Sequence, residues 1–190
     1  MLDGRWADAQ RMTEAVADAQ VALVQRLQYA AQLGGLEQVD PEVRAAVEEF
    51  PAVPAWRAAL AFVVSESGKL DAAREQLELL AEHDFDDVPF DGHWIATLNL
   101  CGWVADRLRH ERAAELLFER LRPYAGVGAV NGAGAATQGP VALTLVRLAL
   151  LTGRDAEVDA LLARARNWCE SMRSPVWTAT VERQARALER

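Results

Sequence analysis

Side chains that could carry out catalysis or bind a metal are few in this sequence, and they do not form a complete motif. The three histidines are His83, His93 and His110. His110-Glu111 begins like the zinc-protease motif His-Glu-x-x-His, but Ala114 stands where the second histidine belongs. We therefore expect no metal site and no cofactor. The 28 acidic residues leave chance carboxylate pairs open, and the sequence favours a non-enzymatic function.

Two loops resemble ligand-binding segments without completing them. The glycine-rich stretch 126–139 lacks the Lys-Ser/Thr of a phosphate-binding loop and follows a helix rather than a strand. The acidic stretch 84–92 places Pro89 where a calcium-binding loop that starts at Asp84 needs glycine. We interpret the first as a flexible loop and the second as a solvated loop. Three apolar residues are expected to pack the second loop onto the helices: Phe85, Val88 and Phe90.

Tryptophan is the unusual residue, with six copies against two tyrosines. A Trp-x-Ala-x-Leu/Val pattern recurs at Trp56, Trp94 and Trp177, which predicts core positions, and Trp6 lies at a similar place. Trp103 and Trp168 fit no such pattern. Compared with the patterned tryptophans, these two are the better candidates for an aromatic surface that contacts a ligand, although core packing is the favoured interpretation for both.

Composition sets the class of protein. The chain has 190 residues, of which 51% are hydrophobic, and this predicts one domain over residues 1–190. Its net charge of −8 argues against binding to nucleic acid. The longest apolar stretch, 141–151, is too short to span a membrane, and the polar N-terminus is unlike a signal peptide. We expect a cytoplasmic protein in which Cys101 and Cys169 are reduced and buried.

Glycine and proline divide the chain into helix-sized pieces, whereas signals for β-strands are nearly absent. Asp40-Pro41 predicts a helix start, with Asp40 as the capping residue. The stretch 5–33 reads as one long helix or two, which gives nine or ten helices in total. The other expected helices cover 40–50, 54–67, 70–82, 93–109, 110–121, 140–152, 154–172 and 175–188.

Helices led by bulky residues alternate with helices rich in small residues. Trp56 and Leu60, for example, precede Ala73, and the smaller side chains allow neighbouring helices to pack closely. This alternation resembles the tetratricopeptide repeat, whose period is about 34 residues. The predicted fold is all-α: a right-handed, TPR-like α-solenoid of stacked antiparallel helix pairs.

Four short stretches carry a more specific resemblance: LDGRWADA (2–9), FPAVPAWRAAL (50–60), RPYAG (122–126) and GPVA (139–142). They resemble the C-terminal helical-repeat region of large actinobacterial regulatory ATPases, among them LuxR-type activators and cyclase-linked signal-transduction NTPases. The chain has no Gly-x-x-x-x-Gly-Lys-Ser/Thr motif. The resemblance therefore implies the repeat region without the NTPase or DNA-binding domains.

In a tetratricopeptide solenoid the first helix of each pair lines the concave face. Counting the family's concave positions from the tryptophan position of each repeat predicts a binding surface on that face. Its candidate residues are Arg57, Ile95, Asn99, Trp103, Arg147, Glu182 and Arg186.

Three functions remain open at this point. The leading hypothesis is a regulatory interaction or sensor module that binds a protein partner or small ligand on the concave face. The alternative is a small-molecule-binding protein or biosynthetic-pathway enzyme with a tryptophan-lined pocket. The third is an oligomerisation unit that self-associates through an uncovered N-terminal helix.

Overall fold

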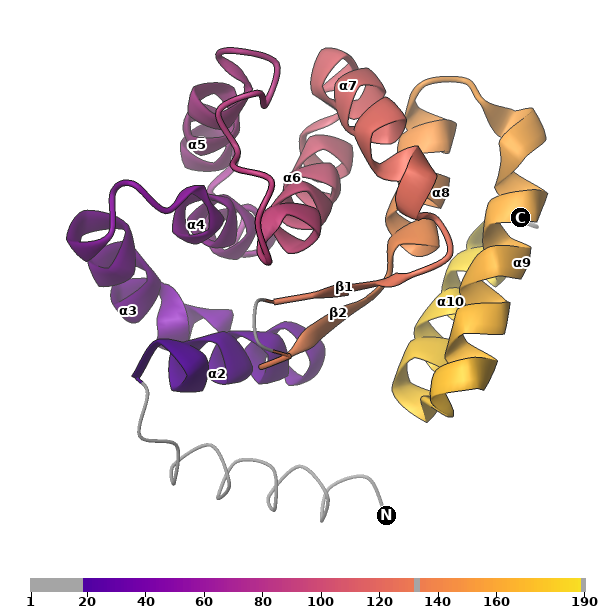
Figure 1. The fold of residues 1–190 in the computed structure, drawn as a ribbon, viewed down its shortest axis with the longest axis horizontal. Helices are drawn as coiled ribbons and strands as arrows, with labels where there is room; N and C mark the ends of the chain where they lie inside the picture. The colour runs from indigo at the N-terminus through magenta and orange to yellow at the C-terminus, as the bar shows by residue number, and fades with distance from the viewer. Residues whose placement is uncertain (1–18, 132–133, 189–190) are drawn as a thin grey trace.

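The chain is mainly helical in a computed structural model that describes residues 19–131 and 134–188. Nine α-helices lie within these residues, in agreement with the predicted all-helical class (Figure 1). Trp6 and the first part of the predicted 5–33 helix lie outside the described residues. The helices are α2 (Ala19–Leu33), α3 (Leu36–Glu49), α4 (Pro54–Glu66), α5 (Leu70–Ala81), α6 (Trp94–Leu108), α7 (Glu111–Leu121), α8 (Val141–Leu151), α9 (Asp155–Met172) and α10 (Pro175–Leu188).

Local residue chemistry explains why the boundaries from α4 onward fall within one residue of the predicted ones. Pro54 and Pro175 occupy the first position of α4 and α10, where the missing N–H costs no helical hydrogen bond. Gly68 and Gly153 take positive φ angles of 78° and 70° in the turns after α4 and α8. His110 caps α7, because its Nδ1 accepts a hydrogen bond from the Ala113 N–H at 3.2 Å.

Helix α3 begins earlier than predicted, and Pro41 lies inside it rather than at its start. The Asp40 carboxylate binds Arg44 at 2.7 Å and Lys69 at 3.1 Å, so it does not cap the helix. Val39 and Val43 are buried on either side of the proline. Packing of this face keeps the segment helical although proline removes one backbone hydrogen bond.

The glycine-rich loop expected between α7 and α8 is partly ordered into strands, which the sequence did not predict. After the 3₁₀ turn Arg122–Tyr124, strands β1 (Gly128–Val130) and β2 (Thr137–Pro140) pair antiparallel. A Cβ on Gly128 would lie 2.5 Å from the Trp168 ring, and one on Gly139 would lie 2.5 Å from the Trp177 ring. Close contact with two tryptophans from α9 and α10 therefore requires glycine at both positions, and it holds the hairpin in place.

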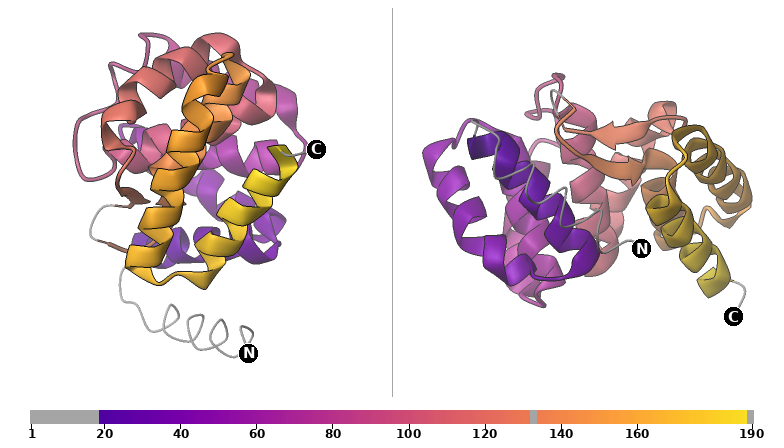
Figure 2. Two further views of the ribbon diagram at one scale, coloured as in Figure 1. Left: turned by 90° about the vertical axis from the view of Figure 1, so that its right-hand side faces the viewer. Right: turned by 90° about the horizontal axis from the view of Figure 1, so that it is seen from below.

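The helices follow one another around a curve, and the hairpin lies on the inner side, directed towards α2 (Figure 1). Helix α4 packs on α3, α5 and α6, while α8 packs on α6, α7 and α9. One continuous apolar core runs from Leu23 in α2 to Ala185 in α10. Figure 2 shows α9 and α10 side by side at the C-terminal end of this arrangement.

Gly102 allows α6 and α8 to approach each other closely. A Cβ at this position would lie 2.5 Å from Cγ2 of Thr144. The contact places Thr144 against α6, where its hydroxyl becomes part of the site described below.

Both cysteines are free and buried, as predicted. Complete burial raises the pKa of the Cys101 thiol to about 12, and burial also raises the pKa of Cys169. These thiols lack the electropositive setting of a reactive cysteine. Within the described ranges, no helix combines the length and apolar character needed to cross a membrane.

Candidate functional site

A pocket of about 560 Å³ opens between α2, α6, α10 and the β-hairpin. This volume is in the range of sites that hold small organic molecules. Its apolar wall is contributed by four helices and includes Leu27, Phe62, Leu100, Val176 and Trp177.

Five side chains form a continuous hydrogen-bonded series beside this wall, here called the polar chain. Trp103 Nε1 donates to Thr144 Oγ1 at 2.8 Å, and that hydroxyl donates to Asn99 Oδ1 at 2.5 Å. Asn99 Nδ2 donates to Gln138 Oε1 at 3.0 Å. Gln138 Nε2 lies 3.5 Å from Asn131 Oδ1 at the far end. The polar chain thus connects α6, α8 and the hairpin.

The polar chain has one direction of donation, which leaves its donors available to the pocket. Asn99 and Gln138 each use one of two amide hydrogens along the chain, and both line the pocket. Asn131 accepts at the end of the chain, so its own amide hydrogens are not spent on it. The amides therefore present surplus hydrogen-bond donors to a bound molecule.

Arg147 lines one side of the pocket and makes two contacts there. Its guanidinium lies over the Trp103 ring at 4.1 Å from the centroid, and Nη1 binds Asp106 Oδ2 at 3.1 Å. Its buried Nε has no hydrogen-bond partner among the described residues, and neither has the buried Oε1 of Gln32 across the pocket. Buried polar atoms are normally satisfied, so these two mark positions where a polar ligand or water fits.

The pocket lining carries positive charge only. Arg147 and Arg183 line it, and no aspartate or glutamate does among the described residues. Arg183 is exposed and donates to Thr180 Oγ1 at 3.1 Å, one helical turn away. In the described part of the chain Arg183 has no carboxylate partner, whereas Arg147 is paired with Asp106.

Three of the predicted concave-face residues line this pocket: Asn99, Trp103 and Arg147. They come together because α6 and α8 pack directly against each other, with Gly102 at the contact.

The other four predicted residues lie outside the pocket. Arg57 binds Gln76 Oε1 at 2.8 Å, and Glu182 binds Arg166 at 2.7 Å, a contact that lowers the pKa of Glu182. Ile95 packs against the apolar core, and Arg186 is exposed on α10. Helix α10 turns a different face to the pocket, one that includes Ala179 and Arg183, so the offsets carried to this helix were out of phase.

Sequence reasoning missed the residues that complete the site. Thr144 lies in the apolar stretch 141–151, where only Arg147 was predicted as a site residue, and Gln138 and Asn131 lie in the stretch 126–139, which was interpreted as a flexible loop. A polar residue inside an otherwise apolar helix, as Thr144 is in α8, was the one available signal. Trp168 packs against the apolar core and against Gly128 of the hairpin, as the favoured core interpretation predicts, and it does not line the pocket.

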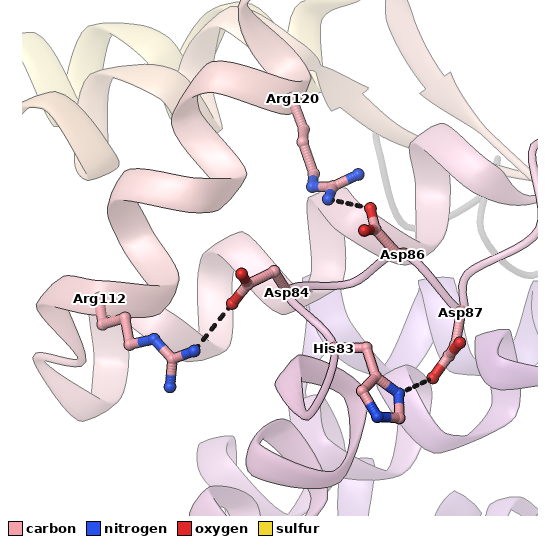
Figure 3. Close-up of polar contacts among 6 residues, drawn as sticks. All are labelled: His83, Asp84, Asp86, Asp87, Arg112 and Arg120. Atoms are coloured by element: carbon pink, nitrogen blue, oxygen red, sulfur yellow. Dashed lines mark hydrogen bonds and ion pairs between the residues drawn. The ribbon is translucent and has the colours of Figure 1, made fainter.

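The acidic segment 83–91 forms a second polar cluster, on the outside of the molecule. On α7, Arg112 pairs with Asp84 and Arg120 pairs with Asp86 (Figure 3). His83 Nδ1 lies 2.5 Å from Asp87 Oδ2. Phe85 and Val88 are buried beneath the segment as predicted, but Phe90 is 77% exposed, against prediction. Phe90 instead lies edge-on to Trp94, with ring centroids 5.1 Å apart.

Neither cluster has the composition of a metal centre. No group of three or more metal-binding side chains occurs among residues 19–131 and 134–188. In comparisons with known proteins, no family model matches the chain, and no curated protein or solved structure matches it either.

Proposed function

We propose that this protein is a non-catalytic binding module whose pocket accepts a small organic ligand with a largely apolar body. The observation that carries this proposal is the polar chain: five hydrogen-bonded side chains set against an apolar wall in a pocket of about 560 Å³. Pockets of this kind bind through the apolar wall and orient the ligand through a few fixed polar groups.

The lining supports binding rather than catalysis. Among the described lining residues there is no histidine, cysteine, aspartate or glutamate. Amides, a threonine hydroxyl and guanidinium groups supply the polar contacts, and these do not exchange protons near neutral pH. Such a lining can hold and orient a molecule, which is what a sensor module requires.

We also propose that the helices form a TPR-like right-handed solenoid that serves a regulatory system. Support comes from the packing of each helix on its successor, together with the contacts of α4 with α6 and of α6 with α8. The pocket lies on the side of the curve that holds the hairpin, where a solenoid presents its concave face.

Binding of an uncharged fluorescent probe tests the proposed function. N-phenyl-1-naphthylamine becomes bright in apolar surroundings, so wild-type protein should raise its emission in a saturable manner. Ala179→Trp places a large side chain at the pocket and should abolish this increase. Thr178→Trp is the matched control, because Thr178 is the neighbouring residue on α10 and does not line the pocket. Loss of probe binding in both variants, or in neither, would contradict the proposal.

A further inference from the structure

We infer that the pocket selects an organic monoanion, a carboxylate on an apolar or aromatic body, whose charge is met by Arg183, with Arg147 in the same lining. This inference rests on the proposed function and names the class of ligand. It depends on the presence of two arginines in one apolar pocket without a lining carboxylate.

The charges around the pocket favour a single negative charge on the ligand. Arg147 and Arg183 contribute two positive charges, and Asp106 behind Arg147 offsets one of them. Asp106 Oδ1 also lies 3.9 Å from Nη1 of Arg109, which does not line the pocket. One positive charge remains, so a carboxylate is matched, whereas a dianion would leave one charge unpaired in apolar surroundings.

The two arginines have different parts in this arrangement. Arg147 is held by the Trp103 ring and by Asp106, and it forms a rigid wall of guanidinium and indole. Arg183 has no such restraint, since its one hydrogen bond is to Thr180 on the same helix. Arg183 is therefore the residue whose charge a ligand carboxylate can pair with at no loss of an existing ion pair.

The polar chain supplies the pocket with hydrogen-bond donors in addition to those of the two arginines. Asn99, Gln138 and Asn131 offer amide hydrogens that the chain itself does not use. A carboxylate accepts several hydrogen bonds and donates none, so it suits a lining with surplus donors. Hydrogen bonds with one charged partner are also shorter and stronger than neutral ones.

The local charge is opposite to that of the whole chain, which carries −8. General electrostatic attraction would therefore draw cations to this protein, not anions. Selective uptake of an anion would therefore have to come from the pocket itself.

A pair of probes that differ only in the acid group measures the selectivity. Isothermal titration would compare 1-naphthaleneacetate with 1-naphthaleneacetamide, which have the same ring and nearly the same shape. Wild-type protein should bind the acid about tenfold more tightly than the amide, as expected for one charge-assisted contact in a partly buried site.

Two arginine variants of α10 locate the source of that preference. Arg183→Met keeps the apolar stem and should bring the acid down to the affinity of the amide. Arg186→Met removes the same charge from the same helix but outside the pocket lining, so the acid should keep its advantage. Circular dichroism would verify that both exposed substitutions leave the helices intact.

The outcomes separate this inference from the proposed function. If acid and amide bind wild-type protein equally, or if Arg186→Met removes the preference as fully as Arg183→Met, the monoanion inference is wrong. The neutral dye would still bind in that case, and the pocket would keep its proposed function. Failure of the dye to bind overturns both.

Discussion

The polar chain and the acidic segment are both clusters of hydrogen-bonded side chains, yet they differ in charge and in exposure. The polar chain is neutral, and its two central members, Asn99 and Thr144, are buried. In the acidic segment, Asp86 and Asp87 have side chains that are 72% and 76% exposed. One cluster is thus built into the core, and the other covers its surface.

This difference determines what each cluster can contribute. Water competes for the exposed ion pairs and screens them, so each contributes between zero and about 1 kcal/mol. A buried amide or hydroxyl that loses its partner cannot turn to water, and it costs about 1–3 kcal/mol. We therefore expect the neutral cluster to dominate both stability and the shape of the pocket.

The largest effect should follow from Thr144→Val, which keeps the shape of the side chain and removes its hydroxyl. Trp103 Nε1 and Asn99 Oδ1 both lose their partner. The free energy of unfolding, measured in urea, should therefore fall by about 3 kcal/mol. Thr152→Val is the control, because the Thr152 hydroxyl binds only backbone carbonyls of α8, those of Leu148 and Ala149. Equal losses of unfolding free energy in the two variants would mean that the polar chain stabilises the fold no more than an ordinary hydrogen bond to the backbone does.

Gly139→Ala should have the next largest effect, through the support of the polar chain by the hairpin. Gly139 has φ of 88°, and its added Cβ would overlap the Trp177 ring. Strain and overlap together should cost about 2 kcal/mol in thermal or urea unfolding. Gly134→Ala has a similar φ of 83° with nothing within 4 Å, so it isolates the strain. A loss as large in Gly134→Ala would assign the whole effect to backbone strain.

Breaking an ion pair of the acidic segment should change the stability of the protein far less. A double-mutant cycle with Asp84→Asn and Arg112→Gln should give a coupling energy below about 0.5 kcal/mol. Asparagine suits position 84 because the backbone there has φ of 54°. A coupling above 1 kcal/mol, measured by urea unfolding at physiological salt, would remove the contrast between the two clusters.

The smallest effect is the pH dependence of the His83–Asp87 contact. The hydrogen bond to Asp87, and then its charge, raise the pKa of His83 above its ordinary 6.5. A raised pKa means that the protonated form is favoured in the folded protein. The stabilisation is therefore complete below pH 6.5 and disappears as pH rises through the folded pKa. Proton NMR titration should show this pKa fall towards 6.5 in Asp87→Asn, and an unchanged value would disprove the contact.

Local sequence was sufficient to predict the helices, because their ends depend on residues within one turn. Pro54 and Pro175 begin helices, and Gly68 and Gly153 follow the ends of others, whatever the rest of the chain does. Pro41 shows the limit of this reasoning. Its surroundings resemble a helix start, but burial of Val39 and Val43 extends the helix beyond it.

The candidate site was predictable only where helix phase and packing agreed. Asn99 and Trp103 lie four residues apart on α6, and Arg147 lies on α8, which packs against it. On α10 the same offsets led to Glu182 and Arg186, which lie outside the pocket, and away from Arg183. An error of one residue, about 100° of rotation around the helix axis, is enough to exchange a lining residue for an outer one.

The sequence by itself determined the helical class of this protein and nearly every helix boundary, since these follow from propensity and capping within a few residues. Tertiary structure alone decided the pocket. Three of the four hydrogen bonds in its polar chain join residues 39–45 positions apart, and its hairpin is held by tryptophans from two later helices. Contacts of that span depend on how whole helices rotate and pack, which no local pattern specifies.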